Sequence, residues 1–544
     1  MSPAPAATVG LPRVPVYTRG GVVCSRSPLA VSTGLRVLAQ GGNAFDAAIA
    51  VSAVENVVLP PMCGLGGHLF AILYDARSGK VHNVNSSGAA PSGATPEFFR
   101  SRGHQFVPPT GPLSAEVPGQ VNGWEAIQKR FCTRPLKELL QPAIAYASDG
   151  FPLPPILANN FATSKALLAS FSSTARVFLR DGQPPQTGDV LVQKDLARSL
   201  ERVASGGAEE FYRGELAREI VAAHRAAGGL FTLDDFARHK TDVYEPLSTT
   251  YRGVTVYQTR PPTQGYMLLQ MLDLLEGFDL ASMGHLSADA IHLMVEAKKL
   301  TFSDRNRYAG DPNTVPFRVE EFLSKQYAAE RRKLIDPRRA ASESPAGVPA
   351  GTDTSYFCVA DTEGNAVSLI HSLFAGFGSG FVAGNTGILL NNRARGFSLQ
   401  EGHPNVIAPG KHTMHTLNCY MLFRDGVPWV IAGTPGGDFQ TQGGVQIVTS
   451  LVDYGLGLQE AIDAPRWNSE PGTVPDTMHE PQRVEVEHGM PQETIRGLEA
   501  RGHHVAPQGR GATKGIVQLI AFDHRRGVKW GASDSRADGH AGAI

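Results

Sequence analysis

Cysteine, excess charge and long hydrophobic runs are all scarce in this chain of 544 residues. Its five cysteines are scattered and form no Cys-x-x-Cys pair, which argues against a disulfide framework and a thiolate zinc site and favours a reducing compartment. Fifty Lys and Arg residues balance 51 Asp and Glu residues, so no overall field attracts nucleic acid or an anionic membrane. No window reaches the roughly 18 apolar residues of a membrane span, and prolines interrupt the region where a signal peptide needs an apolar run. We therefore predict a cytoplasmic protein without nucleic-acid or membrane partners.

The common catalytic signatures are missing as well. The chain has no GxxxxGK[ST], HExxH, GxSxG or EF-hand motif. The GLGGHL segment at 64–69 has the glycines of a nucleotide loop but ends in Leu69, and we interpret it as a tight turn or an oxyanion-side loop. His412 and His415 lie three residues apart with no carboxylate beside them, which favours a polar or substrate-contacting pair over a metal site. The sequence signals neither a metal nor an organic cofactor.

The residues that are present describe a globular chain rich in turns, with 42% hydrophobic residues, 59 Gly and 38 Pro. Residues 28–40 have the leucine spacing of a helix that ends at Gly41. Asn43 is placed to cap a second, buried helix that reaches Val58. Two β-rich runs around a Ser-Gly turn predict a hairpin over 70–85.

Composition divides the rest of the chain. The middle, from about 135 to 332, has mostly helical spacing, and 335–353 is so poor in large apolar residues that we expect an exposed, mobile segment. Strand-like patterns then follow at 355–373, 387–392, 419–433 and 517–534, with helices near 445–456 and 493–502. No internal repeat is present.

One of these strand pairs brings two hydroxyl groups together. A three-residue loop at 362–364 with Gly364 in the bulge position fixes the register of a hairpin. That register places Thr354 directly opposite Ser372, with Cβ atoms about 4.5–5.5 Å apart. Such a pair is often a simple cross-strand contact, and the geometry alone leaves that interpretation open.

The position of Thr354 favours a catalytic interpretation. It begins a strand directly after the segment expected to be mobile, where cleavage of the backbone would release it as a new N-terminus. A free α-amino group has a pKa of about 7.7–8.0, close to the value that a general base needs. One residue would then supply both the nucleophilic hydroxyl and the proton acceptor.

Several distinctive motifs lie along almost the whole chain. They are SPLAVSTGLRVLAQGGNAFDAAIA, VVLPPMCGLGG, EVPGQVNGW, GGLFTLDDFARH, RPPTQGYMLLQMLDLLEGFDL, EAKKLTFSDRNRYAGDP, DTSYFCVADTEGNAVSL, FGSGFVAGNTGILLNN, GTPGGD, APRW and GASDSR. Together they resemble the γ-glutamyltranspeptidase family of N-terminal-nucleophile (Ntn) hydrolases. The resemblance implies an α+β fold, a four-layer αββα sandwich, made as a precursor that cleaves itself. Residues 1–353 would form the large subunit and 354–544 the small catalytic subunit, intertwined in one catalytic domain.

The resemblance also implies roles for single residues. The nucleophile falls on Thr354, a neighbouring hydroxyl on Ser355, and the hydroxyl that orients the new amine on Ser372. The oxyanion donors fall on the backbone N–H groups of Gly436 and Gly437 in GTPGGD. Loss of one such donor typically costs about 10²–10³ in rate.

The chain departs from the family where γ-glutamyl enzymes hold glutamate. Ser87 stands where they have the Arg that binds the α-carboxylate, and LNNRARGFS puts Arg393 and Arg395 near the position of the Asp that binds the α-amino group. A paired-Ser contact is changed to His415 and Thr416. These departures resemble those of oxamate amidohydrolase and the glutaryl or cephalosporin acylases.

We therefore expect a self-cleaving amidohydrolase whose acyl group carries a carboxylate but no α-amino group. Arg393 or Arg395 would bind that carboxylate, because a guanidinium fork suits it, although both arginines also fit a structural ion-pair role. Two alternatives stay open. One is a γ-glutamyltransferase or glutathione hydrolase with altered contacts, and the other is a non-catalytic binding module on the same fold. The expected partners are a small amide substrate and the chain's own fragments, and a homo-oligomer is compatible with the sequence.

Overall fold

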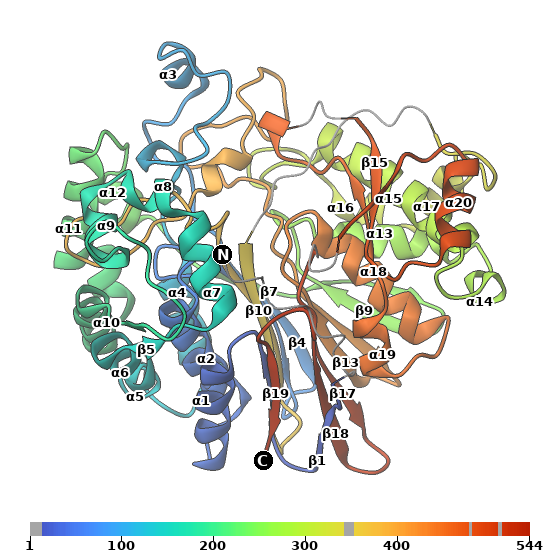
Figure 1. Cartoon of the computed structure of the whole chain (residues 1–544), viewed down its shortest axis with the longest axis horizontal. Helices are drawn as coiled ribbons and strands as arrows, with labels where there is room; N and C mark the ends of the chain where they lie inside the picture. The colour runs from blue at the N-terminus through green and yellow to red at the C-terminus, as the bar shows by residue number, and fades with distance from the viewer. Residues whose placement is uncertain (1–12, 342–352, 478–480, 510–513) are drawn as a thin grey trace, which may run out of the picture.

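Two seven-stranded antiparallel sheets lie face to face between two layers of helices (Figure 1). The computed structural model describes residues 13–341, 353–477, 481–509 and 514–544. This arrangement is the αββα sandwich that the sequence predicts.

The first sheet carries Thr354. Its strands in spatial order are β19 (His540–Ala543), β2 (Val22–Ser25), β10 (Asp353–Ala360), β11 (Ala366–Phe374), β3 (His68–Asp75), β4 (Lys80–Ser86) and β7 (Asp242–Tyr244). The second sheet runs β1 (Val16–Thr18), β18 (Val528–Ser533), β17 (Gln518–Asp523), β13 (Val427–Gly433), β12 (Tyr420–Arg424), β9 (Val254–Gln258) and β8 (Leu247–Tyr251). Two small sheets join β14 (Trp467–Glu470), β15 (Arg483–Val486) and β16 (Val505–Pro507), and β5 (Phe151–Pro152) and β6 (Val190–Leu191).

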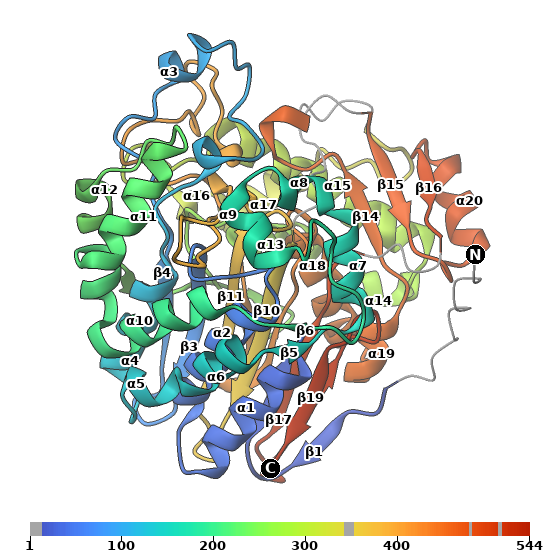
Figure 2. The same ribbon diagram turned by 60° about the vertical axis from the view of Figure 1, so that its left-hand side comes forward.

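Helices form the two outer layers. Beside the first sheet and around its upper end are α1 (Pro28–Ala39), α2 (Ala44–Val58), α3 (Pro96–Arg100), α4 (Gln120–Phe131), α5 (Leu136–Leu139), α6 (Gln141–Asp149), α7 (Pro155–Thr163), α8 (Lys165–Ala169), α9 (Ser172–Phe178), α10 (Lys194–Tyr212), α11 (Glu215–Ala226) and α12 (Leu233–Ala237) (Figure 2). On the other side are α13 (Tyr266–Leu275), α14 (Leu280–Met283), α15 (Ala288–Tyr308), α16 (Val319–Phe322), α17 (Lys325–Arg332), α18 (Phe439–Val452), α19 (Leu458–Asp463) and α20 (Gln492–Ala500). Single 3₁₀ turns are η1 (Pro112–Ser114), η2 (Arg393–Gly396) and η3 (Pro475–Thr477).

The first two helices form as their sequence predicts. Gly41, with φ +83°, follows the end of α1 in the left-handed conformation that glycine tolerates. Asn43 caps α2, and Asp46 completes a capping box by accepting the N–H of Asn43. Every residue of α2 is buried, which explains its nearly uniform run of small apolar residues.

Three hydrophobic cores fill the spaces between the four layers. The alternation of side chains along β10 shows which of these spaces Thr354 faces. Phe357 and Val359 point into the core under the helices of the first layer. Tyr356 and Cys358 point into the core between the two sheets. Successive side chains of a strand point to opposite faces, so Thr354 shares the inter-sheet face with Tyr356. The candidate nucleophile therefore lies at one end of the space between the sheets.

Some sequence expectations about elements are incomplete or wrong. Region 135–332 is mostly helical, as predicted, but it also contributes the short strands β7, β8 and β9 to the two large sheets. Residues 387–392 form isolated bridges at Leu389 and Leu390 instead of a strand. The segment expected to be mobile over 335–353 is partly anchored, because Ile335 is buried and Ala340 donates its N–H to Arg501 O. Residues 342–352 of that segment lie outside the described residues.

The five cysteines form no disulfide. Among the described residues, no helix has the length and apolarity needed to cross a membrane.

Candidate active site

The hairpin of β10 and β11 brings the two predicted hydroxyl groups together. Residues 355–360 of β10 pair with 366–371 in the predicted register, and an irregularity between Asp353 and Ser355 shifts the pairing at the end of the strand. Thr354 Oγ1 and Ser372 Oγ lie 3.1 Å apart, and both residues are buried. Ser372 Oγ also accepts the backbone N–H of Phe374 at 2.7 Å. Ser372 is thereby fixed beside the hydroxyl of Thr354.

The GLGGHL turn presses directly on this end of the hairpin. A Cβ atom on Gly67 would lie 2.5 Å from the backbone oxygen of Ser372, a distance that only glycine allows. The next residue, His68, pairs with Ser372 across β3 and β11. The turn therefore positions a histidine next to the candidate site, in agreement with its interpretation as a tight turn.

The predicted oxyanion loop leaves the second sheet beside β10. Gly433, the last residue of β13, packs so closely on Tyr356 that a Cβ atom would lie 2.4 Å from its ring. Gly436 and Gly437 then adopt φ +123° and +58° just before α18. Within the described residues, the N–H groups of these two glycines have no hydrogen-bond acceptor. They are free to donate to an oxyanion.

The two candidate arginines have opposite surroundings. Arg393 is completely buried, contacts Thr416 Oγ1 through Nη1 at 3.3 Å, and stacks 4.1 Å over the ring of Phe374. Its Nε and Nη2 have no acceptor in the described part of the chain. Burial lowers the pKa of Arg393 to about 9, although Glu116 and Asp438 oppose the shift. The side chain therefore keeps its charge at neutral pH and has unused donors.

Arg395, in contrast, is used structurally. Its Nη2 and Nε donate to Asp476 Oδ2 at 2.7 and 3.1 Å. Asp476, which lies in η3, thus provides the charge partner of the Arg395 guanidinium. Of the two predicted arginines, only Arg393 offers free donors inside the protein.

The remaining predicted residues divide in the same way. His415 is buried with both ring nitrogens unpartnered, and its ring lies 5.1 Å from that of His68. Burial, with help from Arg393, lowers the pKa of His415. Ser355 Oγ is also buried and without a partner among the described residues. Ser87 Oγ instead donates to Asn85 Oδ1 at 2.8 Å and contacts His412, so the structure shows it in a closed local network.

Glu116 and His68 are parts of this site that the sequence analysis missed. Glu116 is fully buried, and neither carboxylate oxygen has a hydrogen-bond partner in the described structure. Asn391 Oδ1 accepts the backbone N–H groups of both Glu116 and Arg393, at 3.1 and 3.0 Å. This shared contact holds the backbones of Glu116 and Arg393 on either side of Asn391. The available signals were an acid between Ala115 and Val117 in an apolar segment and a histidine at the start of an apolar strand.

His68, Glu116 and His415 have potential ligand atoms within 4.8 Å of one another. His68 Nδ1, however, accepts the N–H of Gly88 at 2.8 Å. In a neutral imidazole the other nitrogen then carries the proton, so His68 Nε2 is a donor instead of a metal ligand. Its Nε2 lies 3.7 Å from Glu116 Oε2. The residues fit an anion-binding group better than a cation site.

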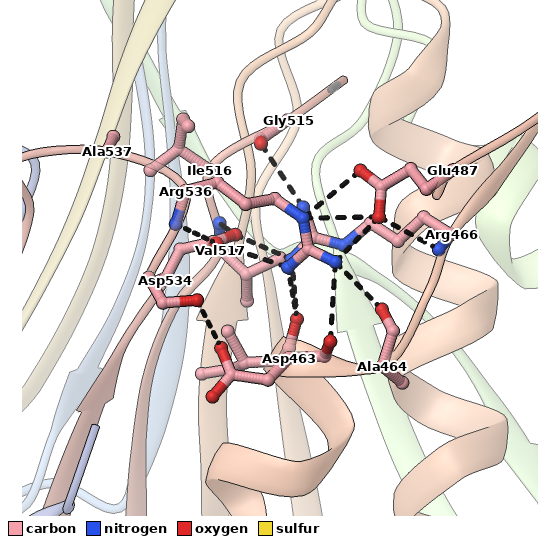
Figure 3. A network of polar contacts seen from close by, with 12 residues as sticks. Asp463, Ala464, Arg466, Glu487, Gly515, Ile516, Val517, Asp534, Arg536 and Ala537 are labelled. Carbon is pink, nitrogen blue, oxygen red and sulfur yellow. Dashed lines mark hydrogen bonds and ion pairs between the residues drawn. The ribbon is translucent and has the colours of Figure 1, made fainter. Parts of the chain in front are cut away.

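A buried ion network joins the APRW and GASDSR segments to the segment that contains Gly515 (Figure 3). Arg466 Nη2 pairs with Asp534 Oδ2 at 2.6 Å, and Arg536 pairs with Glu487 at 2.6 Å. Asp534 also accepts the N–H of Val517. This network fixes the segment that contains Gly515, whose backbone N lies close to Gly436.

The fold and this arrangement define the class of the protein. It is a hydrolase with the Ntn fold, in which two antiparallel sheets are packed between helices. The chain belongs to the gamma-glutamyltranspeptidase family, whose profile matches residues 30–544.

Three comparisons describe its relatives. The chain is 39% identical over 525 residues to the glutathione hydrolase-like YwrD proenzyme of Bacillus subtilis (strain 168), covering 96% of this chain and 98% of that protein. It is 33% identical to the oxamate amidohydrolase proenzyme of Klebsiella pneumoniae, covering 96% and 98% of the two chains. The crystal structure of cephalosporin acylase from Bacillus halodurans superposes with a TM-score of 0.92 at 35% identity, covering 100% and 99%.

Proposed function

We propose that the protein hydrolyses a small amide through an acyl-threonine intermediate after cleaving itself before Thr354. Thr354 Oγ1 attacks the amide carbonyl while its new α-amino group accepts the proton, and Ser372 orients that amine. The N–H groups of Gly436 and Gly437 stabilise the oxyanion. The amine leaves, and water then releases the acyl group. The 3.1 Å contact of Thr354 with Ser372 and the free N–H groups of the loop support this assignment.

The acyl group in this proposal carries a carboxylate. The observation that carries the assignment is Arg393, a buried guanidinium with two unused donor atoms. Guanidinium groups bind carboxylates through paired, charge-assisted hydrogen bonds. Oxamate, named in one relative, is an amide with an adjacent carboxylate, which agrees with this chemistry.

A second candidate function is γ-glutamyl hydrolysis or transfer, because another relative is named as glutathione hydrolase-like. A γ-glutamyl group brings an ammonium as well as a carboxylate. Arg393 and Arg395 stand near the position of the missing Asp, and the charge of Arg393, which forms no ion pair within the described residues, repels an ammonium. Release of p-nitroaniline from γ-glutamyl-p-nitroanilide tests this candidate directly.

The proposed function is tested by intact mass and by activity, with the Thr354→Ala variant as control. Cleavage between Asp353 and Thr354 gives fragments of 353 and 191 residues, whereas Thr354→Ala stays at 544 residues. The wild type should hydrolyse the mono-p-nitroanilides of dicarboxylic acids from oxalic to glutaric acid, and the variant should not. An uncleaved, inactive wild type would instead favour a non-catalytic binding module. The cytoplasmic location and any homo-oligomer remain predictions from the sequence.

A further inference from the structure

In the described part of the chain, four buried side chains around His68, which pairs with Ser372, carry polar atoms without hydrogen-bond partners. They are Arg393 with Nε and Nη2, Glu116 with both carboxylate oxygens, His68 with Nε2, and His415 with both ring nitrogens. They come from η2, the segment before α4, β3 and the loop before β12. Unpaired buried polar groups are costly, so four of them at one place indicate a binding site for a polar group.

The surroundings of Glu116 favour its neutral form. In the described structure, no Lys or Arg forms an ion pair with it within 4.0 Å, and the imidazole at 3.7 Å belongs to His68, which is neutral. The groups facing it from neighbouring elements are His68, His415, Arg393 and, at longer range, Asp311. Burial raises the pKa of Glu116 well above its usual range, although Arg393 and the backbone N–H of Thr413 oppose this shift. An uncompensated buried carboxylate protonates instead of remaining charged.

We propose that Glu116 is a specificity-determining residue that, as a neutral carboxylic acid, donates a hydrogen bond to the carboxylate of the acyl group. This inference rests on the proposed function and names a second recognition group for the same substrate. Arg393 supplies the positive charge and two donor atoms, and His68 Nε2–H supplies a further donor. Together with the Glu116 hydroxyl, these match the roughly four acceptor sites of a carboxylate. An ammonium would face the same donors and the charge of Arg393.

The test compares charged and neutral substrates of equal length. Carboxylate-terminated p-nitroanilides from oxalyl to glutaryl are each paired with the carbamoyl analogue that lacks the charge. For each pair, kcat/KM of the carboxylate substrate is divided by kcat/KM of its carbamoyl analogue. Titration of the Thr354 amine affects both values equally, because both substrates react through it, and so it does not change the ratio. In the wild type this ratio should fall as pH rises through the pKa of Glu116, because the ionised carboxylate repels the substrate carboxylate.

Two substitutions separate the hydrogen bond from the charge. Glu116→Gln keeps a donor and cannot ionise, so its ratio should stay within about threefold of wild type at neutral pH. An alkaline fall that persists in this variant reports loss of the Arg393 charge instead. Glu116→Leu removes the donor and should lower the ratio roughly ten- to a hundredfold. Intact mass shows that each variant cleaves itself, and an unchanged cooperative melting curve shows that it is folded.

Other outcomes would overturn the proposal. An unchanged ratio in Glu116→Leu would mean that Glu116 does not contact the acyl group. A Glu116→Gln enzyme as impaired as Glu116→Leu would mean that Glu116 acts as an anion, toward a cationic group. Failure of the wild type on every amide would count against the proposed function instead. In that event, binding of oxalate, succinate and glutarate to wild type and variants, measured by calorimetry, still tests Glu116.

Discussion

At the scale of single residues, Arg393 and Arg395 show how neighbours in sequence take different roles. Arg395 forms a partly buried ion pair with Asp476, which accepts hydrogen bonds from its Nε and Nη2. Arg393 is buried and forms no ion pair with another described residue, so its charge carries a desolvation cost. Such a cost is typical of a residue retained for binding.

Substitution of Arg393 should therefore damage recognition and not folding. We expect Arg393→Met to lower kcat/KM for the carboxylate-terminated p-nitroanilide at least tenfold, because a charge-assisted hydrogen bond is lost. The melting temperature should stay equal or rise, since the buried charge is removed. Arg395→Met is the matched control and should change kcat/KM by less than about threefold. A drop in stability with unchanged selectivity would show that Arg393 is structural.

The same scale shows what the sequence could and could not predict about the site. The contact between Thr354 and Ser372 was predictable, because the loop length and Gly364 fix the register of residues 355–360. The irregularity between Asp353 and Ser355, which removes the predicted direct pairing of Thr354, was not. Glu116 was not singled out, because its neighbours His68 and Arg393 come from segments 48 and 277 residues away. The choice between Arg393 and Arg395 also required the structure, since it depends on Asp476.

At the scale of elements, local signals predicted α1, α2 and the hairpin of β3 and β4, which carry caps, alternation and turns. The three strands β7, β8 and β9 were missed because they are at most five residues long and lie between helices. Their stability comes from pairing with strands far along the chain, such as β9 with β12. Short strands held by distant partners leave little periodicity in the sequence.

The network around Asp534 gives a prediction about stability at this scale. Burial would raise the pKa of Asp534, but Arg466 and Arg536 outweigh burial and lower it. A lowered pKa means that the stabilisation is present at neutral pH and is lost as pH falls through the folded-state pKa. Asp534→Asn should cost about 3–5 kcal/mol at pH 7, because the buried Arg466 loses its charge partner.

Denaturant unfolding at pH 7 and at lower pH measures this difference. The gap between wild type and Asp534→Asn should narrow as the wild-type carboxylate is protonated. Asp523→Asn, which breaks a pair with the exposed Arg526, is the control and should cost less than about 1 kcal/mol. Equal costs for the two variants at pH 7 would contradict a structural role for the network.

At the scale of the whole molecule, the two proposed fragments share both sheets. In the first sheet, β10 and β11 of the small fragment lie between β2 and β3 of the large fragment. In the second, β18, β17, β13 and β12 lie between β1 on one side and β9 and β8 on the other. Separation of the fragments would break backbone ladders in both sheets and expose three cores. The sequence predicted this interleaving only through its resemblance to a family.

Cleavage should consequently leave the assembly intact. Under native conditions the fragments of 353 and 191 residues should travel together in a one-to-one ratio, with a mass near 58.1 kDa or a multiple of it if the protein is a homo-oligomer. Native mass spectrometry measures both the ratio and the multiple. In denaturant, the fragments should separate only in the transition that also unfolds them, because their strands hold one another in place. Fragments that part in native buffer would contradict this interleaved architecture.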